Sequence, residues 1–199
     1  MILAQDFYAR PTLDVAHDLL GKVLVHRAGD GVTAGIIVEL EAYIGENDPA
    51  CHAAAGPTAR NAPLYGPPGH AYVYLNYGLH NMVNAVTEPA GSPAAILVRA
   101  LEPVEGLPLM HRRRDRAAWR AGKPPVNDAH LCRGPGNLTL AMGIDRTLDA
   151  VPLFTPPLTI EDRGLTVGAI VWGPRIGITK GVEQPWRGRV AGHASVSRP

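Results

Sequence analysis

The sequence predicts an α+β fold, in which a mostly antiparallel or mixed, curved β-sheet carries flanking helices. Three observations support this prediction. With 199 residues, 46% of them hydrophobic, the chain is long enough for one sizeable core. Apolar and polar residues alternate in short runs, most clearly over residues 37–43 and 71–78. Glycine and proline separate these runs, and few stretches have helical spacing. We therefore expect residues 1–199 to form a single domain.

The N-terminal elements follow from local punctuation. Residues 12–20 have the spacing of a short amphipathic helix, with Thr12 as its cap and Gly21 as its stop. Two apolar runs follow, separated by a glycine-rich turn, and they predict strands at residues 22–26 and 32–43.

The middle of the chain predicts a long loop and then a hairpin. Residues 45–69 are rich in proline and glycine without any period, and loops of that length in compact domains are often functional. Strands are predicted at residues 70–77 and about 81–86, so that a protruding hairpin carries Tyr77 at its tip. A further strand is expected at residues 95–101.

The C-terminal half predicts two helices and several short strands. The first helix should lie within residues 102–121 and the second within residues 134–143, which open on Gly-Pro-Gly and end at glycine. The expected strands are residues 158–161, 165–172, 175–179 and 190–197.

Composition limits the classes of function. No run of eighteen apolar residues occurs and residues 1–6 do not resemble a signal peptide, so we expect a cytoplasmic protein with no membrane contact. Cys51 and Cys132 lie far apart and supply neither a disulfide framework nor a zinc pattern. His52 next to Cys51 lacks a second ligand pair at suitable spacing, so no metal site is predicted.

Positive charge is concentrated in the second half of the chain, although the net charge is only +1. It is densest in residues 111–123, where we single out four arginines as candidate phosphate contacts: Arg112, Arg113, Arg114 and Arg116. Arginine suits phosphate oxygens, and cations near a polyanion gain from counterion release. A solvated helix face would have the same composition, so the charge permits nucleic-acid binding without requiring it.

Carboxylates and phenols follow a strand-like spacing in two places. Side chains repeat every two residues along a strand, so Glu39, Glu41 and Tyr43 should share one face. Val38, Leu40 and Ala42 should take the other. Three of the six tyrosines fall within residues 72–77. An acid beside an aromatic wall suits chemistry on a nucleobase, whereas a solvent-facing strand and ordinary sheet packing remain open alternatives.

Six motifs in order resemble the alkyladenine (3-methyladenine) DNA glycosylases. They are Val38-Glu39-Leu40-Glu41-Ala42-Tyr43-Ile44-Gly45, His52, Tyr72-Val73-Tyr74 with Tyr77-Gly78, Asn84, Leu97-Val98-Arg99-Ala100-Leu101-Glu102-Pro103, and Leu131-Cys132-Arg133-Gly134-Pro135-Gly136. The resemblance is collinear over nearly the whole chain.

The resemblance implies a role for each matching residue. Glu41 is the expected general base, and Arg99 and the backbone at Ile178 help to hold the water that attacks the sugar. Tyr43, His52 and Tyr74 form the pocket for an extruded base, and Asn84 rejects guanine. Tyr77 is the expected wedge left in the duplex.

The implied enzyme removes 3-methyladenine, hypoxanthine and similar purines from double-stranded DNA and leaves an abasic site. We expect a monomer without metal or cofactor, associated with the nucleoid if bacterial. A lyase would need an amine nucleophile, and no lysine lies in the proposed site segments. Gly188-Arg189 departs from the family, which tends to place an aromatic residue there. A noncatalytic nucleic-acid-binding module and a hydrolase of free nucleosides remain alternatives.

Overall fold

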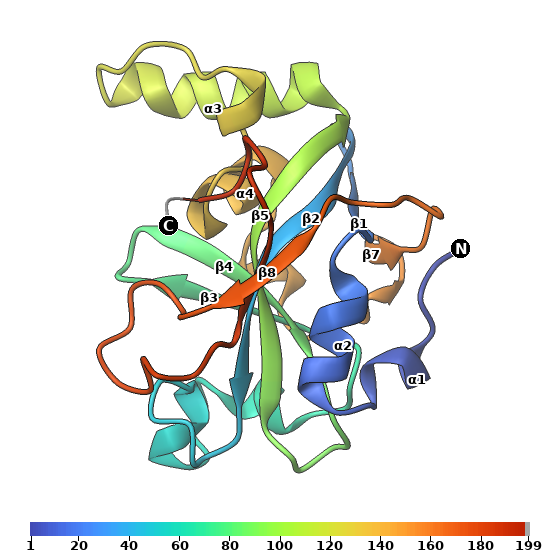
Figure 1. Cartoon of the computed structure of the whole chain (residues 1–199). Coiled ribbons are helices and arrows are strands. Elements are labelled where there is room, and N and C mark those ends of the chain that lie inside the picture. Colours follow the sequence, from blue (N-terminus) through green and yellow to red (C-terminus); the bar gives the residue numbers. More distant parts are fainter. Residues whose placement is uncertain (198–199) are drawn as a thin grey trace.

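The computed structural model describes residues 1–197 and confirms the α+β prediction (Figure 1). Within these residues nine strands form one antiparallel sheet in the order β3-β4-β5-β2-β1-β7-β6, with β9 paired to both β2 and β8. The strands are β1 (Val23–Ala28), β2 (Gly31–Ile44), β3 (Ala71–Asn76), β4 (His80–Val86), β5 (Ala94–Glu105), β6 (Phe154–Thr155), β7 (Leu158–Glu161), β8 (Ile170–Gly173) and β9 (Arg187–Val190).

Helices cover this sheet and close the main core. They are α1 (Gln5–Tyr8), α2 (Thr12–Leu19), α3 (Leu107–Arg120) and α4 (Pro135–Met142), with short 3₁₀ turns η1 (His52–Ala55), η2 (Ala62–Tyr65), η3 (Asp128–His130) and η4 (Arg146–Leu148). Helix α4 packs on β4 and β5, α3 lies against α4, and α2 contacts β2. Burying their apolar stripes against the sheet stabilises the fold.

Strands β2 and β5 form the centre of the sheet, and their pairing is interrupted at three residues: Val38, Arg99 and Val104. Ile37 pairs with Leu101 and Leu40 pairs with Val98, but neither Val38 nor Arg99 has a partner in this register. Each unpaired residue is a β-bulge, which bends the strand and redirects side chains.

The bulges overturn part of the alternation expected from the sequence. Ile37 and Leu40 both lie in the main core, whereas Val38 packs with Ala100 in a separate cluster. Glu39 and Glu41 are fully buried, not exposed on an edge strand. The interpretation of a solvent-facing edge strand is therefore wrong, because β2 pairs with β5 and also with β1 and β9.

The start of α2 also differs from the prediction. Pro11 occupies the capping position and Thr12 is already helical. The Thr12 hydroxyl instead donates to the Glu88 carboxylate at 2.5 Å, tying the helix to the end of β4. At the far end of β5, Gly106 has φ +76°, and a Cβ there would collide with the carbonyl oxygen of Val32.

Three of the predicted C-terminal strands need correction. Residues 175–179 form a loop, because Arg175 and the backbone N–H of Ile176 bond to other segments instead of a strand partner. Residues 191–197 are turns, and the strand is β9, just before them. Of residues 165–172, only the end belongs to β8.

In the described part of the chain, none of the helices combines the length and the apolar character needed to cross a bilayer.

Candidate active site

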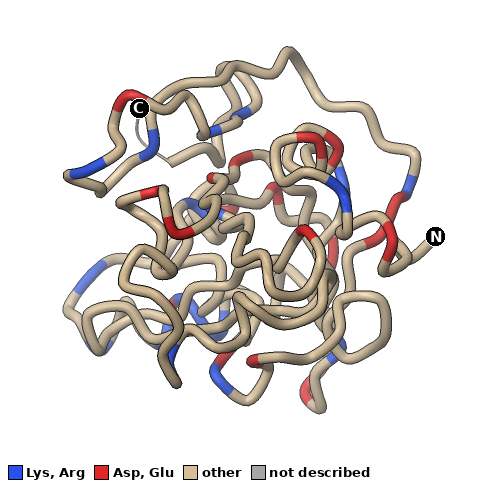
Figure 2. The backbone as a smooth tube through the Cα atoms, turned by 90° about the horizontal axis from the view of Figure 1, so that it is seen from below, with Lys and Arg blue, Asp and Glu red and all other residues tan. Residues whose placement is uncertain are grey.

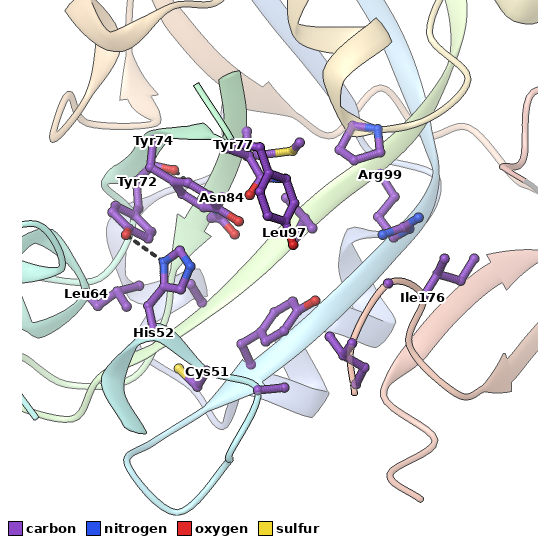
Figure 3. Close-up of a pocket in the computed structure, with 18 residues that line it drawn as sticks. Cys51, His52, Leu64, Tyr72, Tyr74, Tyr77, Asn84, Leu97, Arg99 and Ile176 are labelled. Atoms are coloured by element: carbon purple, nitrogen blue, oxygen red, sulfur yellow. Dashed lines mark hydrogen bonds between the residues drawn. The ribbon is translucent and has the colours of Figure 1, made fainter. Parts of the chain in front are cut away.

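A cavity of ≈ 420 Å³ opens where β3, β4 and β5 meet two loops (Figure 3). Its size suits a small organic group such as a purine. The walls come from the end of β2, the loop at residues 50–52, the hairpin β3–β4, β5 and the loop at residues 176–178. Segments far apart in the sequence therefore build one site.

Glu41 lies directly behind this cavity. Its side chain is fully buried, and it is not itself among the lining residues, but three groups that bond to it are. The Tyr43 hydroxyl and Arg99 Nη1 donate to Oε2 at 2.8 and 3.1 Å. The backbone N–H of Ile176 donates to Oε1 at 2.7 Å. These bonds fix the orientation of the carboxylate against the cavity wall.

Glu39 lies next to Glu41 and holds its neighbour, Arg99. Arg99 Nε and Arg187 Nε donate to Glu39 Oε1 at 3.0 and 2.8 Å, and the backbone N–H of Ser197 donates to Oε2 at 2.7 Å. Burial alone raises the pKa of Glu39, but the charge of Arg99 and the bonds from Ser197 and Arg187 outweigh it, so the pKa lies below its ordinary value. Glu39 is therefore an ionised anchor for Arg99.

The β-bulge at Arg99 explains how one side chain meets both carboxylates. Arg99 is unpaired in the β2–β5 register and bonds to both Glu39 and Glu41. It also lines the cavity (Figure 3). Burial lowers its pKa, but the two carboxylates raise it above the ordinary arginine value. Arg99 therefore remains a cation between two anions, which avoids an uncompensated buried charge.

Aromatic rings form the wall across the cavity from Arg99 (Figure 3). His52 and Tyr74 meet edge to face with ring centroids 4.5 Å apart, and Tyr72 and Tyr74 lie 5.1 Å apart. The Tyr72 hydroxyl and His52 Nδ1 share a hydrogen bond of 2.9 Å. Burial and the charge of Arg60 lower the pKa of His52, which favours a neutral imidazole. Burial raises the pKa of Tyr74 to about 12, so its phenol stays protonated.

The structure gives Tyr72 a larger place in the site than the sequence indicated. It lines the cavity and sets the orientation of His52, whereas its spacing alone favoured sheet packing. Asn84 also lines the cavity, and its Nδ2 donates to the Tyr72 carbonyl oxygen at 2.9 Å. The Asn84 amide is therefore fixed in orientation.

Tyr77 stands at the tip of the β3–β4 hairpin. Its backbone has φ +48° and its side chain is 88% exposed, an unusual environment for a phenol ring. It still lines the cavity mouth. Leu79, two residues on, is 75% exposed and gives the tip a second apolar side chain that the sequence reading missed.

The loop at residues 176–178 contributes backbone as well as side chains. Ile178 lines the cavity, as expected of the site, but the backbone contact to Glu41 comes from Ile176. Arg175 anchors the loop through two bonds to Asp48, and both side chains are fully buried. Its guanidinium also lies 4.7 Å from the ring centroid of Tyr43. None of these contacts has a local sequence signal.

The four arginines singled out on α3 divide into two kinds. Arg113 is bonded to the Ala141 carbonyl oxygen and to Asp30, and Arg114 is partly buried. Arg112 and Arg116 are exposed. Within the described residues they have no hydrogen bond or ion pair.

The described residues contain no cluster of three or more His, Cys, Asp and Glu side chains able to hold a metal ion. Cys51 and Cys132 are both buried free thiols and do not form a disulfide. The cavity itself offers an arginine and aromatic walls, with a buried carboxylate bonded behind them.

Comparisons with known proteins agree with the sequence resemblance. Residues 6–194 match the family model of methylpurine-DNA glycosylase (MPG). A protein of Methanocella arvoryzae is 49% identical over 190 residues, covering 94% of this chain and 90% of the relative. Proteins of Bradyrhizobium diazoefficiens and Burkholderia lata are 46% and 45% identical to this chain, and the matches cover 91% and 92% of those two proteins. All three are named "Putative 3-methyladenine DNA glycosylase". The chain therefore belongs to the methylpurine-DNA glycosylase family of DNA repair enzymes.

Proposed function

We propose that the protein extrudes alkylated or deaminated purines, such as 3-methyladenine and hypoxanthine, from duplex DNA and hydrolyses their N-glycosidic bond. The observation that carries this proposal is the placement of Glu41, a buried and fully oriented carboxylate, behind an aromatic cavity of ≈ 420 Å³. The products are a free base and an abasic site.

Glu41 is the proposed general base. A carboxylate offers about four lone-pair sites, and the contacts from Tyr43, Arg99 and Ile176 occupy three of them. The remaining site on Oε1 can accept a proton from water. Departure of the nucleobase passes through an oxocarbenium-like sugar, and the negative charge of Glu41 stabilises this sugar. The backbone at Ile178 is the proposed additional support for that water.

The aromatic walls are the proposed site for the extruded purine. Tyr43 and Tyr74 offer ring faces, and neutral His52 can hydrogen-bond the base without adding a charge. Alkylation makes a purine electron-poor, which improves both stacking on a phenol and departure as a leaving group. Asn84, held by the Tyr72 carbonyl oxygen, is suited to exclude the exocyclic amine of guanine.

Tyr77 is the proposed wedge. A base can be reached only outside the stack, and unstacking costs a few kcal/mol that an inserted side chain offsets. An exposed phenol at the tip of a hairpin, at the mouth of the cavity, has the position that this role requires.

The reaction should stop at hydrolysis. Cleavage of the DNA strand by a lyase needs an amine that forms a Schiff base with the sugar. The described lining residues of the cavity include no lysine, which supports a monofunctional enzyme.

Incubation with three substrates tests this function. The substrates are a duplex that contains hypoxanthine, the matched duplex that contains adenine, and free inosine. We expect abasic sites in the first, far fewer in the second, and no release of base from the third. Binding of the duplex without abasic sites would instead indicate a noncatalytic module, and turnover of inosine alone would indicate a nucleoside hydrolase.

A further inference from the structure

A second, larger cavity of ≈ 850 Å³ lies beside the first and has no part in the chemistry described above. It is a groove between the C-terminal half of α3, the segment after it, helix α4 and the turn end of the β3–β4 hairpin. We refer to it as the α3–α4 groove. Its lining residues are His80, Arg114, Ala117, Ala118, Ala121, Lys123, Pro124, Pro125, Val126, Asn127, His130, Arg133, Asn137, Leu140 and Ser197.

The α3–α4 groove is positively charged. Its described lining includes Arg114, Lys123 and Arg133 and no acidic residue. Lys123 has no ion pair within the described chain, and Arg114 Nε is buried there without a hydrogen-bond partner. Such unpaired cationic groups favour an anionic ligand.

Two acids on the same segments have partners other than Lys123. Asp128 contacts His111 at 2.6 Å, and Asp115 accepts the backbone N–H of Val126 at 2.9 Å. Neither carboxylate forms an ion pair with Lys123 within the described chain. The start of α4 adds to the positive potential, because its first turn has neither an acidic residue nor a side-chain cap.

The position of the groove relates it to the proposed base site. Pro135 lines the first cavity and Asn137 lines the groove, so the start of α4 separates the two. His80 comes three residues after Tyr77 and packs so closely on Gly136 that a Cβ there would lie 2.8 Å from its ring. The groove therefore lies next to the turn that carries Tyr77, the proposed wedge.

The C-terminal end of α3 and the β3–β4 hairpin extend toward the left in Figure 1. Figure 2, which is turned about the horizontal axis, shows Lys and Arg more frequent on that side than on the right.

We propose that the α3–α4 groove binds the sugar-phosphate backbone of the duplex next to the extruded nucleotide, with Lys123 and Arg114 as its principal phosphate contacts. This inference builds on the proposed function. It adds Lys123 to the arginines of α3 expected to contact phosphates, of which Arg113 is bonded within the protein. A continuous backbone fits better than a free phosphate, since the cationic groups come from three places: Arg114 on α3, Lys123 in the segment after it, and Arg133 just before α4.

A thermodynamic cycle tests the groove directly. The probe is a duplex with a tetrahydrofuran abasic analogue, which does not occupy the base pocket and cannot be hydrolysed. Single phosphates near the analogue are replaced in turn by neutral methylphosphonates. Affinity is measured for the wild-type chain, Lys123→Ala and the matched control Lys22→Ala, whose lysine pairs with Asp162 far along the sheet.

Lys123→Ala should weaken binding about 3–10-fold at ~0.1 M salt and reduce the salt slope by roughly one phosphate contact. One or two methylphosphonates should weaken the wild type but have no further effect on Lys123→Ala. Lys22→Ala should behave as wild type. Equal losses of affinity in Lys123→Ala and Lys22→Ala would contradict the proposed role of the groove. So would methylphosphonate effects that add to the effect of Lys123→Ala at every phosphate.

Hypoxanthine excision by the wild-type chain, measured in parallel, separates the two proposals. If excision occurs but Lys123→Ala binds and responds to methylphosphonates as wild type, only the groove is wrong. If the wild-type chain neither binds the tetrahydrofuran duplex nor excises hypoxanthine, both proposals are wrong.

Discussion

Charged side chains are buried in one region of the molecule and exposed in another. Around β2 and β5, Glu39, Glu41 and Arg99 are buried and paired with one another. On α3, Arg112 and Arg116 are exposed and unpaired within the described residues. Buried ions need complete, well-oriented partners, whereas surface ions stay solvated and adaptable. We therefore infer that the first region is suited to chemistry and the second to binding a polyanion.

Removing Glu39 should show the greatest contrast between the regions. Glu39→Ala leaves Arg99 and Arg187 buried without their shared carboxylate, which should lower the free energy of unfolding by about 3–5 kcal/mol. The exposed pair of Arg10 and Asp18 supplies the control, and Asp18→Ala should cost roughly 0–1 kcal/mol. Denaturant unfolding measures both. Equal losses would show that burial does not distinguish these ion pairs.

Arg175 connects the buried region to the cavity, and its substitution should affect rate more than binding. Arg175→Lys keeps the charge but loses the two-point contact with Asp48 that anchors Ile176 beside Glu41. Single-turnover excision should slow by about 10-fold, because small displacements of catalytic groups are costly. Arg27→Lys, at a half-exposed pair with Glu161, is the control and should excise normally. An unchanged rate in Arg175→Lys would remove this positioning role.

Tyr77 is exposed at the tip of the β3–β4 hairpin, so its loss should affect binding. Tyr77→Ala should weaken binding to lesion-containing duplex by roughly 10-fold, equivalent to ~1.4 kcal/mol. Excision should also depend more steeply on the stability of the base pair that holds the lesion, since the wedge no longer offsets unstacking. The comparison is between the rate of excision of hypoxanthine paired with thymine and the rate of excision of hypoxanthine paired with cytosine. Identical ratios in variant and wild type would contradict the wedge.

The smallest effect concerns acid stability. The native pKa of Glu39 lies below its ordinary value of 4.5, so the unfolded chain binds the proton more readily. The stability that Glu39 contributes is complete above pH 4.5 and is lost as the pH falls from there through the native pKa. Glu39→Gln should therefore show a flatter dependence of unfolding free energy on pH below this value. Asp18→Asn should leave the slope unchanged, and an identical slope in Glu39→Gln would contradict the assignment.

The sequence predicted more of the elements than of their contacts. The β3–β4 hairpin and helix α4 lie where glycine punctuation and periodicity placed them. The segment at residues 175–179 did not become a strand, because Arg175 bonds to Asp48, which is 127 residues away. Local periodicity contains no information on such a partner.

The candidate site shows the same limit. Resemblance indicated Glu41, Arg99 and Tyr74, and the structure brings them to one cavity or its wall. It did not indicate Ile176, whose contribution is a backbone N–H that any residue could supply. Nor could alternation reveal the bulges at Val38 and Arg99, since a bulge depends on the pairing of two strands.

The most direct test of Glu41 is single-turnover excision of hypoxanthine by Glu41→Gln, with Glu105→Gln at the exposed end of β5 as the matched control. If Glu41 activates the water, Glu41→Gln should lose about 10²–10⁴-fold in rate, remain folded, and bind the lesion duplex nearly as tightly as wild type. Glu105→Gln should excise normally. A Glu41→Gln enzyme that excises hypoxanthine at the wild-type rate would contradict the mechanism.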